Sequence, residues 1–112
     1  MSQLTTHVLD TSKGKPAIGL HIVLFHHSEN KWKEISRGIT DDDGRVANLL
    51  EKKKLLPLGT YKLSFEVQNY FARYSIHTLY PCVEIVFQVT TEEHYHIPLL
   101  LSPFGYSTYR GS

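Results

Sequence analysis

The side chains in this sequence that are best suited to do chemistry are its seven histidines. His94 and His96 are two positions apart in a segment with strand-like alternation, so both point to one face of a strand, about 7 Å apart. A single histidine in a strand is most often structural, but burying a pair without purpose is costly, which favours a functional role. A neutral imidazole can accept a proton from water at physiological pH.

Zinc binding is the alternative chemistry for the same pair, because imidazole nitrogens are common zinc ligands. A third ligand would then have to come from another element, and His7 is the candidate. A His-x-His pair alone is a weak metal signal, so we expect a site with no metal and no cofactor. A nucleophilic mechanism is less favoured still, because no serine lies in a nucleophile-elbow motif.

The only cysteine, Cys82, excludes a disulfide within the chain. It follows Pro81 at the start of a segment with strong strand character, so we expect a buried thiol rather than a nucleophile. A disulfide between two copies of the chain is the alternative.

The elements that must position the histidines are short strands separated by turns. Alternating apolar residues and short apolar runs lie between clusters of turn-forming residues. One segment, 69–77, has a spacing closer to that of a helix. Six to eight strands with one short helix indicate an all-β fold, a two-sheet sandwich. The strands are expected at residues 4–10, 18–26, 32–39, 61–67, 82–90, 94–102 and 106–110.

Length and charge limit the possible functions. The 112 residues suffice for a single domain, expected to span residues 1–112, and 41% of them are hydrophobic. Twelve basic against eleven acidic residues leave a net charge of +1, which gives no reason to expect binding to nucleic acid or to an anionic membrane. With no signal peptide and no apolar run of membrane-spanning length, a soluble cytoplasmic protein is expected. The acidic turn at 40–44 lacks the ligand pattern of a calcium loop.

Longer motifs resemble those of the transthyretin-like family. They are Leu9-Asp10, Gly14-Lys15-Pro16-Ala17, the segment 94–103 and the C-terminal segment 106–112, so that the resemblance runs from Thr6 to Ser112. It implies a transthyretin/prealbumin-like β-sandwich. It also implies a homotetramer, a dimer of dimers formed by edge-strand pairing, whose sites lie in the channel where the dimers meet.

This family has two branches, which differ at a few channel positions. Transthyretins carry thyroid hormone, whereas the other branch hydrolyses 5-hydroxyisourate, the unstable product of urate oxidation. Where this chain has His7, Arg45 and His96, transthyretins typically carry lysine, an acidic residue and threonine. The ending Tyr109-Arg110-Gly111-Ser112 is typical of the hydrolases. The resemblance therefore favours a hydrolase, with a non-catalytic carrier of small hormone-like ligands as the alternative.

The hydrolase branch implies a reaction without a cofactor. Hydrolysis of the N1–C6 bond of 5-hydroxyisourate opens its ring and gives 2-oxo-4-hydroxy-4-carboxy-5-ureidoimidazoline. The resemblance implies that His7 and His96 orient and deprotonate water, with the choice of base open between them, and that Arg45 binds the oxyanion. His94 is implied to be structural. The residues implied to contact the substrate are His7, Arg45, Tyr109, Arg110, Gly111 and Ser112.

Overall fold

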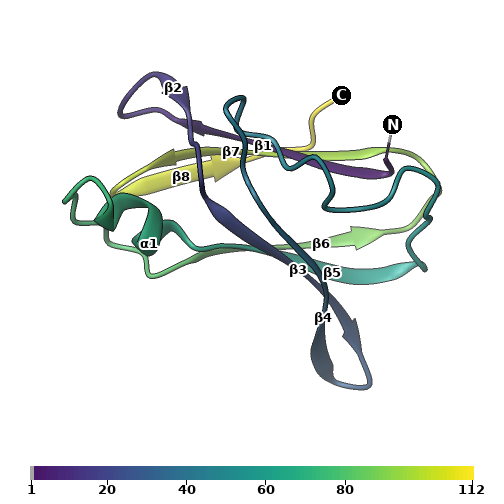
Figure 1. The fold of residues 1–112 in the computed structure, drawn as a ribbon. Helices are drawn as coiled ribbons and strands as arrows, with labels where there is room; N and C mark the ends of the chain where they lie inside the picture. Colours follow the sequence, from purple (N-terminus) through teal and green to yellow (C-terminus); the bar gives the residue numbers. More distant parts are fainter. Residues whose placement is uncertain (1) are drawn as a thin grey trace.

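The computed structural model describes residues 2–112 as a sandwich of two four-stranded sheets with one short helix. Figure 1 shows the sheets as two stacked layers, with the helix at one end. The predicted all-β fold is confirmed. Sheet A has the order β2 (Lys15–Pro16), β1 (Leu4–Asp10), β7 (Tyr95–Ser102) and β8 (Gly105–Thr108). Sheet B has the order β4 (Lys31–Ile39), β3 (His21–Ser28), β5 (Gly59–Phe65) and β6 (Val83–Val89), and α1 (Val67–Ala72) follows β5.

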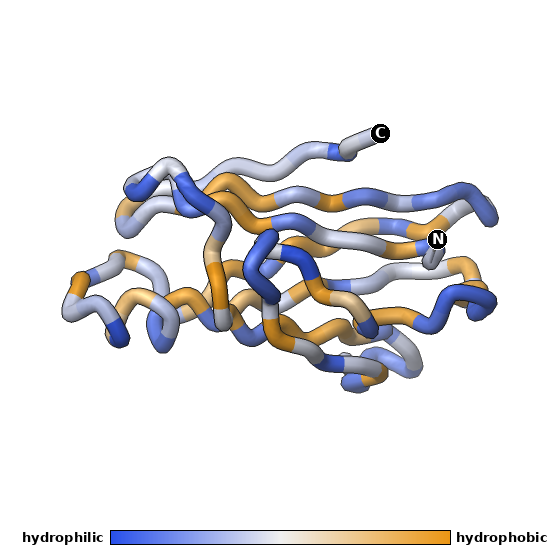
Figure 2. The backbone as a smooth tube through the Cα atoms, turned by 45° about the horizontal axis from the view of Figure 1, so that its top comes forward, coloured by the Kyte–Doolittle hydropathy of each residue, from blue (hydrophilic) through white to orange (hydrophobic). Residues whose placement is uncertain are grey.

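The core lies between the two layers and is filled by alternate residues of the facing strands. In β1, Leu4 and Val8 are buried, whereas Thr5 and His7 remain partly exposed. Figure 2 shows the same alternation of apolar and polar residues along the strands. Removing each aliphatic side chain from water stabilises the fold by about 1.5–3 kcal/mol. One face of β1 is thereby committed to the core, and the other is free to carry a site.

The pairing of β1 with β7 determines which residues share the outward face of sheet A. The two strands are parallel, with Thr5 opposite His96 and His7 opposite Pro98. Residues that are opposite each other in a sheet point to the same face. The register therefore places Thr5, His7 and His96 on one face, although Thr5 and His96 are 91 residues apart in the chain.

The helix was predicted, but its bounds were wrong. It covers Val67–Ala72 instead of 69–77. Phe71 packs into the core, and the chain then leaves the helix because Ser75 adopts a positive φ of 57°. The backbone N–H of Ile76 donates to the carbonyl of Phe71 at 3.1 Å and closes this end. A helix that crosses a membrane would have to be longer and more apolar than any found in residues 2–112.

Two further expectations needed correction. Cys82 is exposed, not buried. It precedes Val83, the first residue of β6, whose side chain is 1% exposed in the core; because direction alternates along a strand, the thiol before it points outward. The strand predicted at residues 18–26 is β3, which begins at His21 because Gly19 adopts a φ of +76° that is incompatible with a strand. The strand at residues 4–10 has the predicted bounds.

Candidate active site

A polar cluster lies on the outward face of sheet A, centred on β1 and β7. The Thr5 Oγ1 atom lies 2.9 Å from Nε2 of His94 and 2.8 Å from Nδ1 of His96. The two imidazole rings are nearly parallel, at 19°, and their centroids are 6.3 Å apart. The predicted same-face pair is thus confirmed. His7 lies two residues beyond Thr5 on β1 and points to the same face.

Arg45 reaches this face through a tight turn. The Asp41 carboxylate accepts a hydrogen bond from the backbone N–H of Arg45 at 3.1 Å, and such bonds hold the Asp41 pKa below its ordinary value. Gly44 has a φ of +77°, and a Cβ there would collide with the carbonyl oxygen of Val8. The Val8 N–H in turn donates to the Gly44 carbonyl at 2.9 Å. An isolated β-bridge consequently places Arg45 opposite His7.

The C-terminal tail flanks the cluster on its other side. The backbone N–H of Gly111 donates to the carbonyl of His96 at 2.8 Å and forms a second isolated bridge. A Cβ on Gly111 would collide with Cδ2 of His96, so only glycine lets the tail lie against the imidazole ring. Tyr109 and Ser112 on either side of Gly111 are exposed.

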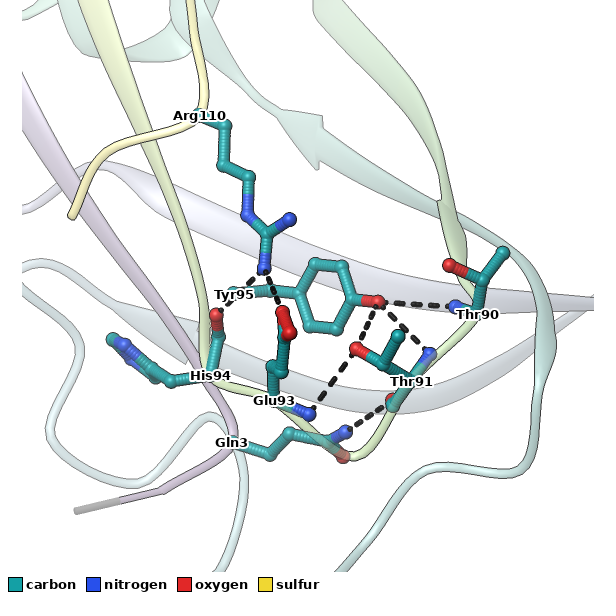
Figure 3. Close-up of polar contacts among 7 residues, drawn as sticks. All are labelled: Gln3, Thr90, Thr91, Glu93, His94, Tyr95 and Arg110. Atoms are coloured by element: carbon teal, nitrogen blue, oxygen red, sulfur yellow. Dashed lines mark hydrogen bonds and ion pairs between the residues drawn. The ribbon is translucent and has the colours of Figure 1, made fainter.

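The Arg110 side chain lies at the sheet edge, where it contacts the chain around Tyr95. Figure 3 shows its guanidinium near the carbonyl of His94, at 3.1 Å, and the carboxylate of Glu93, at 3.6 Å. The guanidinium carbon also lies 4.5 Å from the centroid of the Tyr95 ring. Together with Tyr95, Arg110 lines a cavity of about 310 Å³ between the edges of the two sheets. These contacts fasten the tail to β7.

The Tyr95 hydroxyl forms a second fastening at the same edge. It accepts hydrogen bonds from the backbone N–H groups of Thr90, at 3.0 Å, and Thr91, at 3.1 Å (Figure 3). Hydrogen bonding, first of all by the Thr91 hydroxyl, lowers the pKa of Tyr95 to about 8. The ring on which Arg110 rests is thus held by the loop that precedes β7.

The charges around His96 favour its neutral form. Partial burial lowers the pKa of His96 below the ordinary 6.5, and the positive charge of Arg45 lowers it further. His94 and His7 act in the same direction when they carry a proton. A neutral imidazole near a permanently charged guanidinium can accept a proton from water while the guanidinium stabilises a developing negative charge.

One ring nitrogen of each histidine in the pair already has a hydrogen-bond partner. Among residues 2–112 there is no group of three or more histidine, cysteine, aspartate or glutamate side chains placed to hold an ion. His94 and His96 instead share the Thr5 hydroxyl, which takes up one nitrogen of each ring.

The structure brings most of the expected residues together. His7, Arg45, His96 and Gly111 meet on one face, while the Arg110 side chain lies at the sheet edge. Sequence reasoning missed Thr5. Its hydroxyl was visible as an outward position of a well-defined strand, but the pairing of β1 with β7 that sets it opposite His96 was not.

Comparison with known proteins connects this site to a family. The model of the HIUase/Transthyretin family matches residues 4–111. A 5-hydroxyisourate hydrolase of Mus musculus is 46% identical over 114 residues, which cover 99% of this chain and 96% of the mouse protein.

Two solved structures show that the fold alone does not distinguish a hydrolase from a transthyretin. The 5-hydroxyisourate hydrolase of Klebsiella pneumoniae superposes with a TM-score of 0.86 at 36% identity, over 100% of this chain and 94% of that one. Sea bream transthyretin in complex with thyroxine superposes with a TM-score of 0.91 at 30% identity, over 97% of this chain and 94% of that one. The fold is common to both proteins, so the function has to be argued from the site.

Proposed function

The chain belongs to the HIUase/Transthyretin family, and from this premise we propose that it is a hydrolase that converts 5-hydroxyisourate to 2-oxo-4-hydroxy-4-carboxy-5-ureidoimidazoline in urate degradation. The observation that carries the proposal is the bridge that sets Arg45 opposite His7 on the face that also presents His96. This face supplies a base and a fixed positive charge, the two groups that hydrolysis of an acyl C–N bond requires.

The reaction opens the ring by adding water across the N1–C6 bond. His96 and His7 orient a water molecule and remove its proton as its oxygen attacks C6. The electron pair of C6=O moves onto oxygen, and the Arg45 guanidinium stabilises this oxyanion with parallel hydrogen bonds. Collapse of the oxyanion breaks the C6–N1 bond, and the proton held by histidine passes to N1. The product carries C6 as a carboxylate.

The tail forms the wall of the pocket. Tyr109, Gly111 and Ser112 contact the substrate, and the Ser112 hydroxyl helps to hold water or a histidine. Arg110 contributes by holding this wall in place, because its guanidinium is bonded to the carbonyl of His94 and rests on Tyr95. Gly111 supports this assignment, since its backbone is already paired with that of His96.

The active form is a homotetramer, a dimer of dimers, in which each site is completed by a second copy. Two features support this assembly. Each sheet ends at one side in β6 or β8, and both strands line the cavity at that side of the sandwich, so two edges there are available for pairing with another chain. Arg45 and Tyr109 are exposed in the single chain, so the face lacks the enclosure that excludes bulk water. We expect sedimentation velocity to give one species of four chains.

A carrier of small aromatic ligands is the alternative, and the superposition on the thyroxine complex of sea bream transthyretin favours it. Ligand pockets of this kind are largely apolar. His7, Arg45 and His96 make the corresponding face polar, which argues for the hydrolase.

We also assign the protein to the cytoplasm.

The test is an assay of the untagged protein. 5-Hydroxyisourate is generated in place from urate and urate oxidase, and its ultraviolet decay is followed with and without a chelator. We expect acceleration that survives chelation. Loss of the acceleration on chelation would support the zinc alternative. Decay at the spontaneous rate, together with tight binding of thyroxine, would support the carrier.

A further inference from the structure

We propose that Thr5 is a positioning residue: with His94, it holds the proton of neutral His96 on Nδ1 and so leaves Nε2 as the basic nitrogen. This inference rests on the hydrolase function proposed above. It also selects His96, rather than His7, as the base.

The geometry that carries the proposal is the position of one hydroxyl between two rings. The Thr5 Oγ1 atom is within hydrogen-bond distance of both Nε2 of His94, at 2.9 Å, and Nδ1 of His96, at 2.8 Å. All three side chains are partly buried, and the rings are nearly parallel. The three groups therefore form a short hydrogen-bonded chain along the outward face.

Counting protons leaves two arrangements for this chain. A hydroxyl donates one hydrogen bond, so Thr5 can donate to only one of the two rings and must accept from the other. If Thr5 donates to His96, the Nδ1 lone pair of neutral His96 is occupied and its proton lies on Nε2. That ring then has no free basic nitrogen. If Thr5 donates to His94, His96 carries its proton on Nδ1 and Nε2 is free.

The second arrangement is the one compatible with a base that gains and loses a proton. Protonated imidazole carries hydrogen on both nitrogens, so Nδ1 must then donate to Thr5. With the proton of neutral His96 already on Nδ1, Nε2 can accept a proton without any rotation of the Thr5 hydroxyl. His94 completes the chain as the acceptor for the single Thr5 proton, which gives this otherwise structural histidine a role in orientation.

The contacts of the His96 ring engage Nδ1, and no hydrogen bond to Nε2 is found within residues 2–112. Nδ1 faces the Thr5 hydroxyl on β1, and Cδ2 faces Gly111 in the tail. The His7 ring differs in its hydrogen bonding. Among residues 2–112, no side chain or backbone group forms a hydrogen bond with the His7 ring, so nothing there selects one of its tautomers.

The experiment compares three variants with the wild type by two readouts. Thr5→Val removes the hydroxyl while keeping the shape, and Thr5→Ser restores a hydroxyl. Thr6→Val is the matched control, because the Thr6 hydroxyl is on the same strand but faces the core and donates to the carbonyl of Ile97 at 2.7 Å. The first readout is kcat/KM for 5-hydroxyisourate. The second is the tautomer of His96, from ¹⁵N–¹H correlation spectra of ¹⁵N-histidine-labelled protein, with His96→Gln to assign the signal.

In the wild type we expect His96 to be protonated on Nδ1 when neutral. In Thr5→Val we expect a mixture of tautomers and a fall in kcat/KM of about 10- to 100-fold, which is smaller than or at the lower end of the about 10²–10⁴-fold that a general base contributes, because part of the His96 population keeps the active tautomer. Thr5→Ser should recover kcat/KM to within about threefold of the wild type, and Thr6→Val should not lose more than this.

Two results would overturn the proposal. One is a neutral His96 that is protonated on Nε2 in the wild type. This measurement does not depend on whether a variant folds. The other is wild-type kcat/KM in Thr5→Val. Failure of the proposed function is separate, because an inactive wild type with His96 protonated on Nδ1 would contradict the hydrolase while leaving the positioning geometry in place.

Discussion

The two faces of strand β1 carry two polar clusters of opposite character. At its end, Asp10 is fully buried, and its carboxylate accepts hydrogen bonds from the Tyr70 hydroxyl, at 2.7 Å, and from the backbone N–H of Ser12, at 3.0 Å. At its start, Thr5 and His7 point outward, partly exposed, toward His96 and Arg45. The alternation of a single strand thus separates a buried, hydrogen-bonded cluster from the outward cluster to which we assign the chemistry.

The difference lies in how completely the polar groups are satisfied. Burial, together with the bond to Asp10, raises the pKa of Tyr70 well above its ordinary value, so this hydroxyl stays neutral and donates permanently. His96 has a lowered pKa and a free ring nitrogen, so it is available to accept a proton. A fully satisfied buried network makes the fold rigid, whereas a site needs groups left over to bind substrate.

The largest effect on turnover is expected when the positive charge of Arg45 or the imidazole of His96 is removed. Arg45→Ala and His96→Ala should each lower kcat by on the order of 100-fold or more, because each removes an interaction with the transition state. Thermal unfolding and sedimentation should remain as in the wild type, since Arg45 is exposed and His96 is only partly buried, outside the core.

Arg37→Ala is the matched control for this prediction. Arg37 is also exposed, but it lies on sheet B and pairs with Glu34 at 2.6 Å. Its replacement should leave kcat unchanged. Near-normal turnover in Arg45→Ala or His96→Ala would remove that residue from the mechanism.

An extension of the tail should be the next most damaging change. An affinity tag after Ser112 should reduce kcat/KM on the order of tenfold or more, because Gly111 is paired with His96 and added residues would begin beside the proposed site. The same tag placed before Met1 should have no effect. Equal kcat/KM for the two tagged proteins would count against the tail as a wall of the site.

The inward cluster should respond in the opposite way. Tyr70→Phe removes the hydroxyl that donates to buried Asp10, so we expect a loss of about 1–3 kcal/mol in the free energy of unfolding, measured by denaturant titration. kcat/KM measured well below the unfolding midpoint should not change. A variant with normal stability and impaired catalysis would erase the distinction between the two faces.

The smallest effect concerns the pKa of His96. Because the charge of Arg45 lowers this pKa, Arg45→Gln should raise it, whereas Arg37→Gln should not change it. The measurement is an NMR titration of the His96 ring. In the wild type, the acid limb of kcat/KM should have its midpoint below 6.5, since activity is lost only when His96 becomes protonated at a pH under its ordinary pKa. An unchanged titration in Arg45→Gln would mean that the guanidinium lies too far away to act.

The features of the fold and the site that could be predicted from the sequence are those that depend on neighbouring residues in the chain. The alternation at residues 4–10 predicted β1 with its bounds, and the spacing of His94 and His96 predicted their shared face. Each of these patterns depends only on the geometry of one strand. The prediction of a buried thiol at Cys82 was wrong. A shift of one position along a strand moves a side chain from the core face to the outer face, and the sequence did not settle that position.

Long-range placement was not readable from local patterns. No periodicity shows that Thr5 lies opposite His96, or that Arg110 rests on Tyr95 while Gly111 contacts the histidine. Arg45 was found only through the family resemblance, because its position depends on how the turn at Gly44 docks onto β1. Such contacts arise from strand order and register, which pair segments that are distant in the chain.

The central claim is most directly tested by following the reacting carbon. Urate labelled with ¹³C at C6 is oxidised in place by urate oxidase, and ¹³C NMR records the conversion of the C6 carbonyl of 5-hydroxyisourate into a carboxylate, with and without the untagged protein. We predict that the carboxylate signal appears faster with the protein than in buffer, and that His96→Ala abolishes the difference. Equal rates with and without the wild-type protein would contradict the account.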